Sequence, residues 1–225
     1  MADGVSGRAN SLFFLDPHDD ADHAARLDWM ERAYRRVGLP PRVRLSPLAP
    51  VAVVKELQRR GYLFQHPTIT LRRAFHATTK IETAPTALTT CKIRSSVTLE
   101  DEWLDAFIAC TPRYADNRPI IHKMLGAILD ETRYFLAYEG DRPVATAMSV
   151  TQMRCTTFQN VATLPDYQRR GIARNMMIEA LNASADSGAS WSWLAVEQTN
   201  QAAVGLYRGL GFSDFYSYIY AALDA

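Results

Sequence analysis

The chain has 225 residues, of which 48% are hydrophobic and 22% charged, so it can bury a sizeable core and wholesale disorder is excluded. Its net charge of +1 leaves no global field that would draw it to nucleic acid or to an acidic membrane. Its three cysteines are odd in number and lack C-x-x-C spacing, which argues against a disulfide framework or a zinc site and favours a reducing compartment. No apolar run has the length of a signal sequence or a membrane span, so we expect a cytoplasmic protein without a membrane partner.

The first part of the chain predicts a small α/β unit over residues 1–76. The polar stretch over residues 77–92 predicts a linker to a second unit. Within the first unit, Asp19 or Asp20 can cap the first helix. In chain order the patterns predict a strand over 8–15, a helix ending at Gly38, a strand over 42–45, a helix over 51–60 and a strand over 68–75.

The second unit, over residues 93–225, alternates strand and helix patterns, which implies an α/β layer fold. It opens with two predicted helices and a hairpin whose turn lies at Glu139–Asp141. The predicted elements are helices over 99–109 and 119–129, a hairpin over 132–150, a strand over 156–164, a helix over 171–184, a strand over 191–198, a helix over 200–210 and a strand over 215–221.

Two short segments, one in each predicted unit, have similar sequences, and we call this similarity the echo. "AYRRVGL" (33–39) and "LYRGLGF" (206–212) align at Tyr, Arg and Gly. Either the chain carries an old duplication, or both segments are ordinary helix ends followed by a glycine. Seven residues leave both interpretations open.

The stretch "TLPDYQRRGIARN" (163–175) leads from an apolar strand into a helix and predicts an anion site. The first N–H groups of a helix lack partners, and its dipole favours negative charge. Gly171 lets a ligand approach the backbone, and Arg169, Arg170 and Arg174 add positive charge. A diphosphate would suit this loop, although a solvated basic helix start explains the same residues. The stretch is neither a P-loop nor a G-x-G-x-x-G loop.

The stretch "NQAAVGLYRGLGF" (200–212) predicts a second functional helix. Asn200 stands where a helix requires its N-cap, and Tyr207 lies on the same face two turns further on. Taken alone, Tyr207 is better explained as a core aromatic residue.

Together, "VATLP" (161–165), "QRRGIA" (168–173) and "NQAAVGLYRGLGF" resemble the GNAT superfamily of acyl-CoA-dependent N-acetyltransferases, in both order and spacing. The resemblance covers about Ile93 to Ala225. It implies a mixed, mostly antiparallel central sheet flanked by helices, with acetyl-CoA as co-substrate. Ala173 stands where the family typically has a second glycine, and alanine is tolerated there.

The resemblance also implies a set of cofactor-binding residues. The backbone of the strand would pair with the pantetheine arm, the loop N–H groups would hold the pyrophosphate, and Asn200 would orient the cofactor near the thioester. This set comprises Val161, Ala162, Thr163, Gln168, Arg169, Arg170, Gly171, Ile172, Ala173, Arg174 and Asn200.

Transfer of an acetyl group to an amine requires a proton donor for the leaving thiolate and a proton acceptor for the amine. Tyr207 is expected beside the sulfur as the donor. Glu197 is the first candidate for the acceptor, against the alternative of a surface carboxylate, and His122 is a weaker one. We interpret Cys155 as a packed small residue.

The sequence therefore predicts an N-acyltransferase that moves an acetyl group from acetyl-CoA to a primary amine in a ternary complex. The alternative is a non-catalytic acyl-CoA-binding or sensor module on the same fold. The acceptor is a small-molecule amine or a peptide, with no nucleic acid and no membrane involved, and a homodimer is one option.

Two further features have structural explanations. The acidic and histidine residues of "DPHDDADH" (16–23) fit the start of a helix better than a metal site, so no metal is expected. Tyr114, Trp191, Trp193 and Tyr216 could line an acceptor pocket, but sheet and core packing explains them better. The N-terminal unit resembles the degenerate half of two-unit family members and is expected to bind no second cofactor.

Overall fold

The structure is a computed structural model that describes residues 4–75 and 91–223. The predicted linker over 77–92 falls almost entirely outside these residues, and the domain boundary that it marks stays a prediction. The chain clusters into two compact units, each assembled from separate stretches of sequence. The first unit comprises Met1–Leu71, Ala195–Val204 and Asp214–Ala225, and the second comprises Arg72–Leu194 and Gly205–Ser213.

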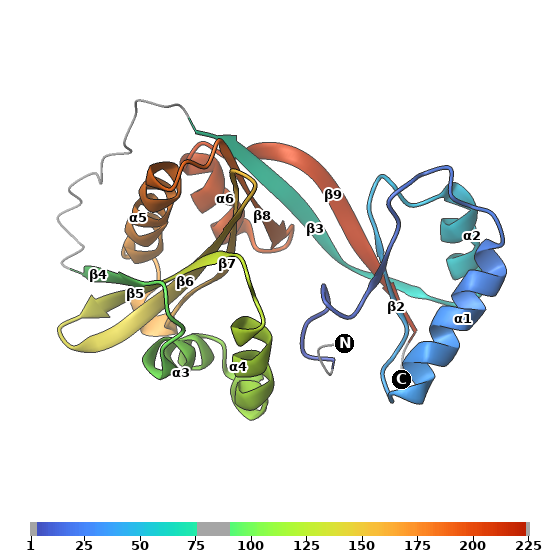
Figure 1. Cartoon of the computed structure of the whole chain (residues 1–225), viewed down its shortest axis with the longest axis horizontal. Coiled ribbons are helices and arrows are strands. Elements are labelled where there is room, and N and C mark those ends of the chain that lie inside the picture. The colour runs from blue at the N-terminus through green and yellow to red at the C-terminus, as the bar shows by residue number, and fades with distance from the viewer. Residues whose placement is uncertain (1–3, 76–90, 224–225) are drawn as a thin grey trace. The chain divides into compact units, whose positions relative to one another are not determined.

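Helices and strands alternate along most of the described chain (Figure 1). Their bounds are β1 (Leu12–Phe13), α1 (His23–Arg36), β2 (Arg42–Leu45), α2 (Val51–Arg59), β3 (Leu63–Ala74), β4 (Lys92–Ser96), α3 (Asp101–Cys110), η1 (Pro112–Asn117), α4 (Arg118–Gly126), β5 (Glu131–Glu139), β6 (Arg142–Gln152), β7 (Cys155–Thr163), η2 (Pro165–Tyr167), α5 (Ile172–Asp186), β8 (Trp191–Glu197), α6 (Gln201–Gly209) and β9 (Ser213–Ala222).

The described strands form one 9-stranded sheet in the order β1-β2-β9-β3-β8-β7-β6-β5-β4. The pairs β1–β2 and β7–β8 are parallel, whereas β2–β9, β4–β5, β5–β6 and β6–β7 are antiparallel. The sheet is therefore mixed and mostly antiparallel, which confirms the predicted fold class.

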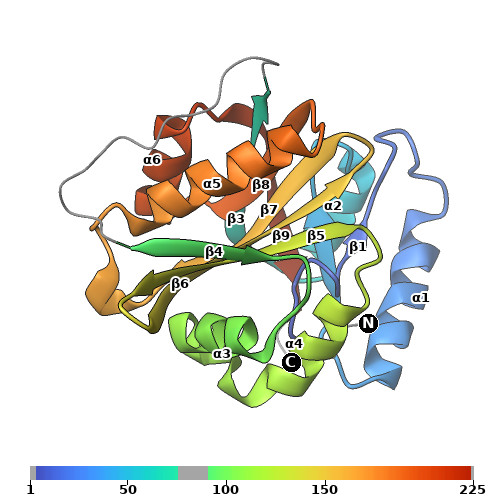
Figure 2. The same ribbon diagram turned by 60° about the vertical axis from the view of Figure 1, so that its left-hand side comes forward.

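In the second unit, α3 and α4 lie on one face of the sheet and α5 lies on the other (Figures 1 and 2). The buried indole of Trp103 fixes α3, because its Nε1 donates to the carbonyls of Phe135 and Ala147 at 3.1 Å each. The predicted hairpin is confirmed by β5 and β6, with Glu139 paired to Arg142. The sequence missed β4, whose "KIRSS" contains a single apolar residue and gives almost no strand pattern.

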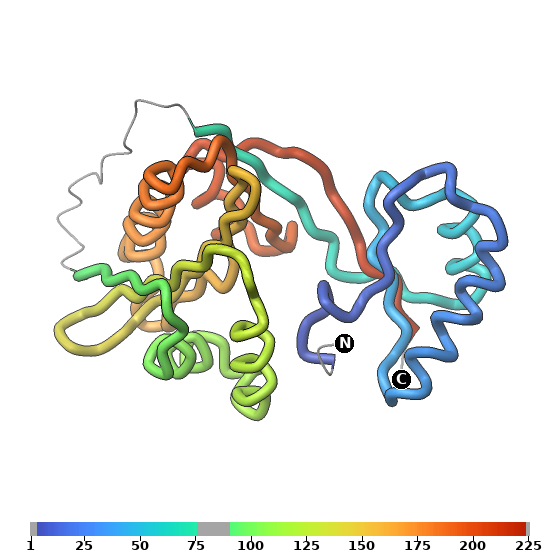
Figure 3. Tube along the Cα trace, in the orientation of Figure 1, coloured from blue at the N-terminus to red at the C-terminus, as the bar shows by residue number. Residues whose placement is uncertain are grey.

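The chain trace of Figure 3 follows the first unit from β1 through α1 and β2 to α2. Its core gathers Leu27, Met30 and Tyr34 from α1 with buried residues of β2 and α2. The predicted cap at Asp19 or Asp20 is wrong. Asp22 is the N-cap and makes no side-chain capping bond, while Asp19 forms an ion pair with Arg26 at 2.6 Å. Strand β1 is also shorter than predicted, and β3 begins earlier.

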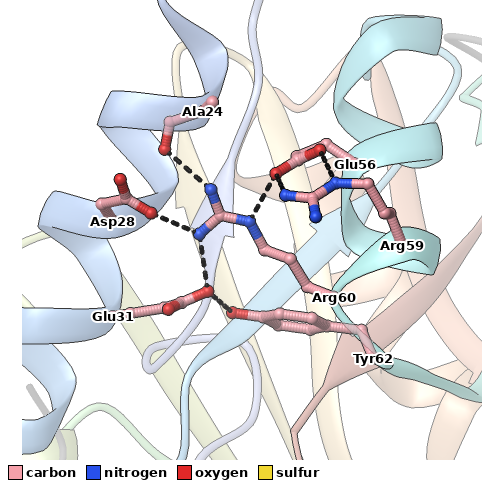
Figure 4. A network of polar contacts seen from close by, with 7 residues as sticks. All are labelled: Ala24, Asp28, Glu31, Glu56, Arg59, Arg60 and Tyr62. Carbon is pink, nitrogen blue, oxygen red and sulfur yellow. Dashed lines mark hydrogen bonds and ion pairs between the residues drawn. The ribbon is translucent and has the colours of Figure 1, made fainter.

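A network around Arg60 ties α1 to the end of α2 (Figure 4). The guanidinium of Arg60, only 14% exposed, lies 2.6 Å from Asp28, 3.0 Å from Glu31 and 2.8 Å from Glu56. The hydroxyl of Tyr62 donates to Glu31 at 3.1 Å. One cation therefore holds carboxylates of two helices together.

Replacing Arg60 by Met is expected to lower the midpoint of thermal unfolding by ~5 °C at pH 7, because the carboxylates then lose their shared cation.

Hydrogen bonds from Arg59 and then Arg60 lower the pKa of Glu56 from 4.5 to about 2. A lowered folded-state pKa stabilises the fold above pH 4.5, and this stabilisation is lost as the pH falls toward 2. Circular dichroism should therefore show variant and wild type converging over that range. A difference that stays constant with pH would contradict this account.

The echo between 33–39 and 206–212 has a local explanation. In each segment the residue after the glycine donates its N–H back to the tyrosine carbonyl, a Schellman helix end. The same motif closes α2, which lies outside the echo. The three sets of bonds are Gly38 N to Arg35 O with Leu39 N to Tyr34 O, Gly61 N to Gln58 O with Tyr62 N to Leu57 O, and Gly211 N to Arg208 O with Phe212 N to Tyr207 O. The echo alone is therefore no argument for duplication.

A repeat of elements is more informative than the echo. The series β1–α1–β2–α2–β3 has the same order as β7–α5–β8–α6–β9, and the first two strands of each series pair in parallel. Helices α2 and α6 each span 9 residues, and Leu57 stands at the position that Tyr207 takes in α6. This order supports the interpretation of the N-terminal part as a degenerate half.

The last strands of the two series are exchanged. Strand β9 of the second series pairs antiparallel with β2 of the first. Strand β3 of the first series lies beside β8 in the strand order. Here Phe75 N donates to Ser190 O at 2.9 Å, and Ser192 Oγ donates to Arg73 O at 3.4 Å. Each series therefore receives a strand from the other.

Candidate active site

Strand β7 opens away from β8 within the sheet. Their parallel register covers Cys155–Thr157 against Trp191–Trp193, and β7 continues to Thr163. The other edge of β7 pairs with β6 as far as Thr163. The half-buried residues Val161, Ala162 and Thr163 thus lie beyond the β8 register, on an edge that can receive an extended ligand.

A bulge turns the backbone of β7 just before these residues. Asn160 has φ 53°, and the register between β6 and β7 shifts between Thr146 and Met148. The hydroxyl of Thr146 donates to the Asn160 carbonyl at 3.1 Å and fixes the bend. The sequence analysis missed the bulge, although an asparagine inside an apolar strand is a recognisable signal for left-handed backbone.

The loop after β7 forms a concave set of backbone groups at the start of α5. Arg169 and Gly171 both have left-handed backbone, with φ of 61° and 79°, on either side of Arg170. Alternation of this kind turns successive N–H groups toward one point, as in anion-binding nests. Gly171 is also the N-cap of α5, whose first N–H groups need partners. The predicted anion site therefore has the backbone geometry that an anion requires.

The side chains of the loop are held by the protein. Arg170 Nη1 lies 3.2 Å from Glu139 Oε1, and the guanidinium stacks 4.8 Å from the centroid of the Tyr167 ring. Gln168 donates to the Thr163 carbonyl at 3.2 Å, and Arg174 donates to the Gly209 carbonyl at 3.2 Å. Arg170 and Arg174 therefore have contacts within the protein, and the role of the loop toward an anion stays a prediction.

The contact of Arg174 with Gly209 joins the first turn of α5 to the last turn of α6, two residues beyond Tyr207. Tyr207 is only 7% exposed and makes an edge contact with Phe212, with 6.1 Å between ring centroids. Burial raises the pKa of Tyr207 to about 12, so its hydroxyl is protonated at neutral pH. The side chain is therefore suited to donating a hydrogen bond, while the raised pKa makes it a weaker acid than an ordinary tyrosine.

Asn200 caps α6 as predicted, because its Oδ1 accepts the N–H of Ala203 at 3.1 Å. Its carbonyl group is thus engaged by the helix, and a role toward the cofactor stays a prediction. Glu197, the last residue of β8, is half exposed and lies 3.4 Å from Nδ1 of His66. Nothing in "LFQHPTIT" indicated that His66 would meet Glu197.

Other candidate groups are explained by packing. Burial raises the pKa of Cys110 to about 11 and also raises that of Cys155, which does not favour a thiolate nucleophile. Tyr114 stacks on Phe107, and Tyr216 contacts neighbouring aromatic rings of β9. His122 is exposed on α4. Within residues 4–75 and 91–223, three or more potential metal ligands do not gather, and no helix has the length and apolar character that crossing a bilayer requires.

A model of the Acetyltransferase (GNAT) family matches residues 97–212, which is more than half of the chain. The chain belongs to the GNAT family. The matched residues include the β7 edge, the loop before α5 and the helix that carries Tyr207, so the GNAT match covers the arrangement described above.

Relatives and solved structures agree with this assignment. The [Ribosomal protein bS18]-alanine N-acetyltransferase of Salmonella typhimurium is 35% identical over 74 residues, 33% of this chain and 50% of the relative. The chain thus spans about half the length of the curated relatives that it matches. A GCN5-related N-acetyltransferase from Sphaerobacter thermophilus superposes with a TM-score of 0.67 at 13% identity, over 92% of this chain and 70% of that one. A tandem GNAT protein from the clavulanic acid biosynthesis pathway superposes with a TM-score of 0.68 at 8% identity, over 92% of this chain and 70% of that one. These structures show the GNAT fold over both units.

Proposed function

We propose that this GNAT protein transfers an acetyl group from acetyl-CoA to a primary amine of a small molecule or peptide, by direct attack within a ternary complex. The left-handed pair Arg169 and Gly171 at the start of α5, next to the free edge of β7, carries this proposal. Such a loop suits a pyrophosphate, and an unpaired strand edge suits the amide groups of a pantetheine arm.

The acetyl transfer would need no covalent enzyme intermediate. The amine nitrogen forms a bond with the thioester carbonyl carbon, and the carbon–sulfur bond breaks. Tyr207 would donate to the sulfur as negative charge develops there, and Glu197 would serve the amine side of the reaction. The raised pKa of Cys110 and Cys155 supports direct transfer over an acyl-cysteine route.

The choice of candidate acceptors is guided by the curated relatives, whose names specify an alanine of ribosomal protein bS18. We therefore place a peptide with an N-terminal alanine beside amino acids, polyamines and small aromatic amines as the candidate acceptors. Release of free thiol from acetyl-CoA, followed over this panel, is expected to rise well above hydrolysis for at least one amine. Tight acetyl-CoA binding without transfer to any amine would instead support the sensor alternative.

A further inference from the structure

The sheet of the first unit has two chemically different faces. Val43 of β2 pairs with Ala221 of β9, and both belong to the core that α1 and α2 cover. Successive residues of a strand point to opposite faces, so the next position along each strand points away from this core. At that position Phe13, Arg44 and Tyr220 lie side by side across β1, β2 and β9. The second face therefore carries an arginine between two aromatic residues.

The guanidinium of Arg44 contacts two aromatic rings. Its carbon lies 4.4 Å from the centroid of the Phe13 ring and 5.6 Å from the centroid of the Tyr218 ring. A ring attracts a cation through its π-electrons, but it supplies none of the lone pairs that the N–H donors of a guanidinium require. These contacts therefore hold Arg44 in place and leave its need for an acceptor unmet.

The described chain supplies no such acceptor. Within residues 4–75 and 91–223, the side chain of Arg44 makes no ion pair and no hydrogen bond, and its Nε is buried. By contrast, Arg26 and Arg60 of the same unit each lie 2.6 Å from a carboxylate oxygen. An unpaired buried donor costs free energy, most of all on a charged group. Arg44 is thus a cation that an anionic ligand would stabilise.

The groups around Arg44 add to its attraction for an anion. The guanidinium of Arg42 lies 5.9 Å from the centroid of the Tyr220 ring. Burial and the neighbouring Tyr218 raise the pKa of Tyr220, so its hydroxyl is protonated at neutral pH and can donate a hydrogen bond. The charges of Arg8 and Arg44 lie close enough to Tyr220 to oppose this rise of its pKa in part. Positive charge and donor groups therefore meet on this face.

We propose that this face of the first unit binds the carboxylate of a small aromatic or apolar acid, with Arg44 as the main contact. A carboxylate is planar and can accept two parallel N–H bonds from one guanidinium. The half-buried rings of Phe13 and Tyr220 offer apolar surface to the body of such a ligand. Every residue of this carboxylate site belongs to the first unit, so the inference does not depend on the proposed acetyl transfer.

The competing explanation is a purely structural role for Arg44. Its contact with Phe13 would then only fasten the short strand β1 to β2. That role requires no ligand, so a binding measurement separates the two explanations.

NMR titration of the full chain with benzoate, at constant ionic strength with chloride as the replaced anion, tests the proposal. The Nε–H signal of Arg44 is assigned by its loss in Arg44→Lys, and we expect it to shift saturably with a Kd of about 1 mM. Benzamide has the same ring without the charge and should give no saturable shift. Inorganic phosphate should bind at least about tenfold more weakly, because it lacks the apolar body that the rings would contact.

Two arginine variants assign the binding to Arg44. Arg44→Lys keeps the charge and loses the planar fork, so the backbone amide signals of β2 should report an affinity for benzoate at least about tenfold lower. Arg35→Gln removes a charge at an exposed position of α1 and should keep the wild-type affinity within a factor of about two.

Three results would overturn the proposal. They are the absence of a saturable shift with benzoate, an equal response to benzamide or to phosphate, and equal affinities of the wild type and Arg44→Lys. The first two are measured on the wild type through the β2 amide signals, so the question is decided even if Arg44→Lys folds poorly. Loss of acetyltransferase activity plays no part in these readouts, and failure of the proposed function would leave this inference standing.

Discussion

Gly171→Glu is expected to abolish acetyl-CoA binding, with affinity lowered at least ~100-fold in calorimetry. Gly171 has φ 79° and is the N-cap of α5, so any side chain strains the nest. A carboxylate there also opposes the pyrophosphate electrostatically and occupies the space next to the first N–H groups of the helix. The backbone strain and the repulsion of the pyrophosphate each lower the affinity for acetyl-CoA about tenfold.

Gly188→Glu provides the matched control. Gly188 follows the other end of α5 with φ 80°, and a Cβ built there meets nothing within 4 Å. The two variants therefore share the conformational penalty and the added charge, and they differ only in which end of the helix they affect. Wild-type affinity in Gly188→Glu, together with loss in Gly171→Glu, assigns the effect to the anion site. Equal affinities in the two variants would show that the cofactor binds elsewhere.

Tyr207→Phe is expected to lower kcat about 100-fold while KM for acetyl-CoA stays within a factor of two. With its pKa at about 12, proton transfer from Tyr207 to a free thiolate is uphill by roughly 3–5 kcal/mol. The same proton transfer from a tyrosine with an unperturbed pKa would cost less free energy. We therefore expect the hydroxyl to stabilise the developing charge on sulfur chiefly by a hydrogen bond, with full transfer only as the bond breaks. The remaining activity of the variant would come from positioning.

The raised pKa of Tyr207 also determines how kcat should depend on pH. Because burial raises the pKa of Tyr207, the donor stays protonated up to about pH 12, so a decline in kcat at moderately alkaline pH must come from another group. Tyr134→Phe is the matched control, since Tyr134 is also a buried tyrosine of the second unit and lies in edge contact with Trp103 at 5.1 Å. Equal kcat values for the two variants and the wild type would remove Tyr207 from the reaction.

Local patterns in the sequence predicted much of the fold. Sequence patterns were sufficient to recognise the β5–β6 hairpin, α5, α6 and the cap at Asn200. Apolar periodicity and turn residues are local signals, because they depend on neighbouring residues only. Gly171 and its arginines also indicated the turn into α5, where Arg169 and Gly171 have left-handed backbone, and the role of this loop toward a cofactor stays a prediction. The sequence could not predict the contacts of Arg170 and Arg174, because their partners Glu139 and Gly209 lie more than 30 residues away along the chain.

The features that sequence reasoning missed depend on long-range pairing. β4 is a strand only because β5 pairs with it, from Lys92 against Tyr138 to Ser96 against Tyr134. His66 gained a partner because β3 leaves its own series and runs beside β8. Neither contact follows from propensity, because each joins residues that are separated by one or more complete elements.

The exchange of β3 and β9 has a consequence for how the chain can fold during synthesis. On the ribosome, β1, α1, β2 and α2 emerge long before β9, the strand that pairs with β2. The hydrogen-bonding edge of β2 must therefore wait until β9 has been made, and the early elements are exposed meanwhile to mispairing and to chaperones. Truncation before β9 should thus leave even the first-made unit incomplete, so release of that strand from the ribosome sets the earliest time at which this unit reaches its final structure.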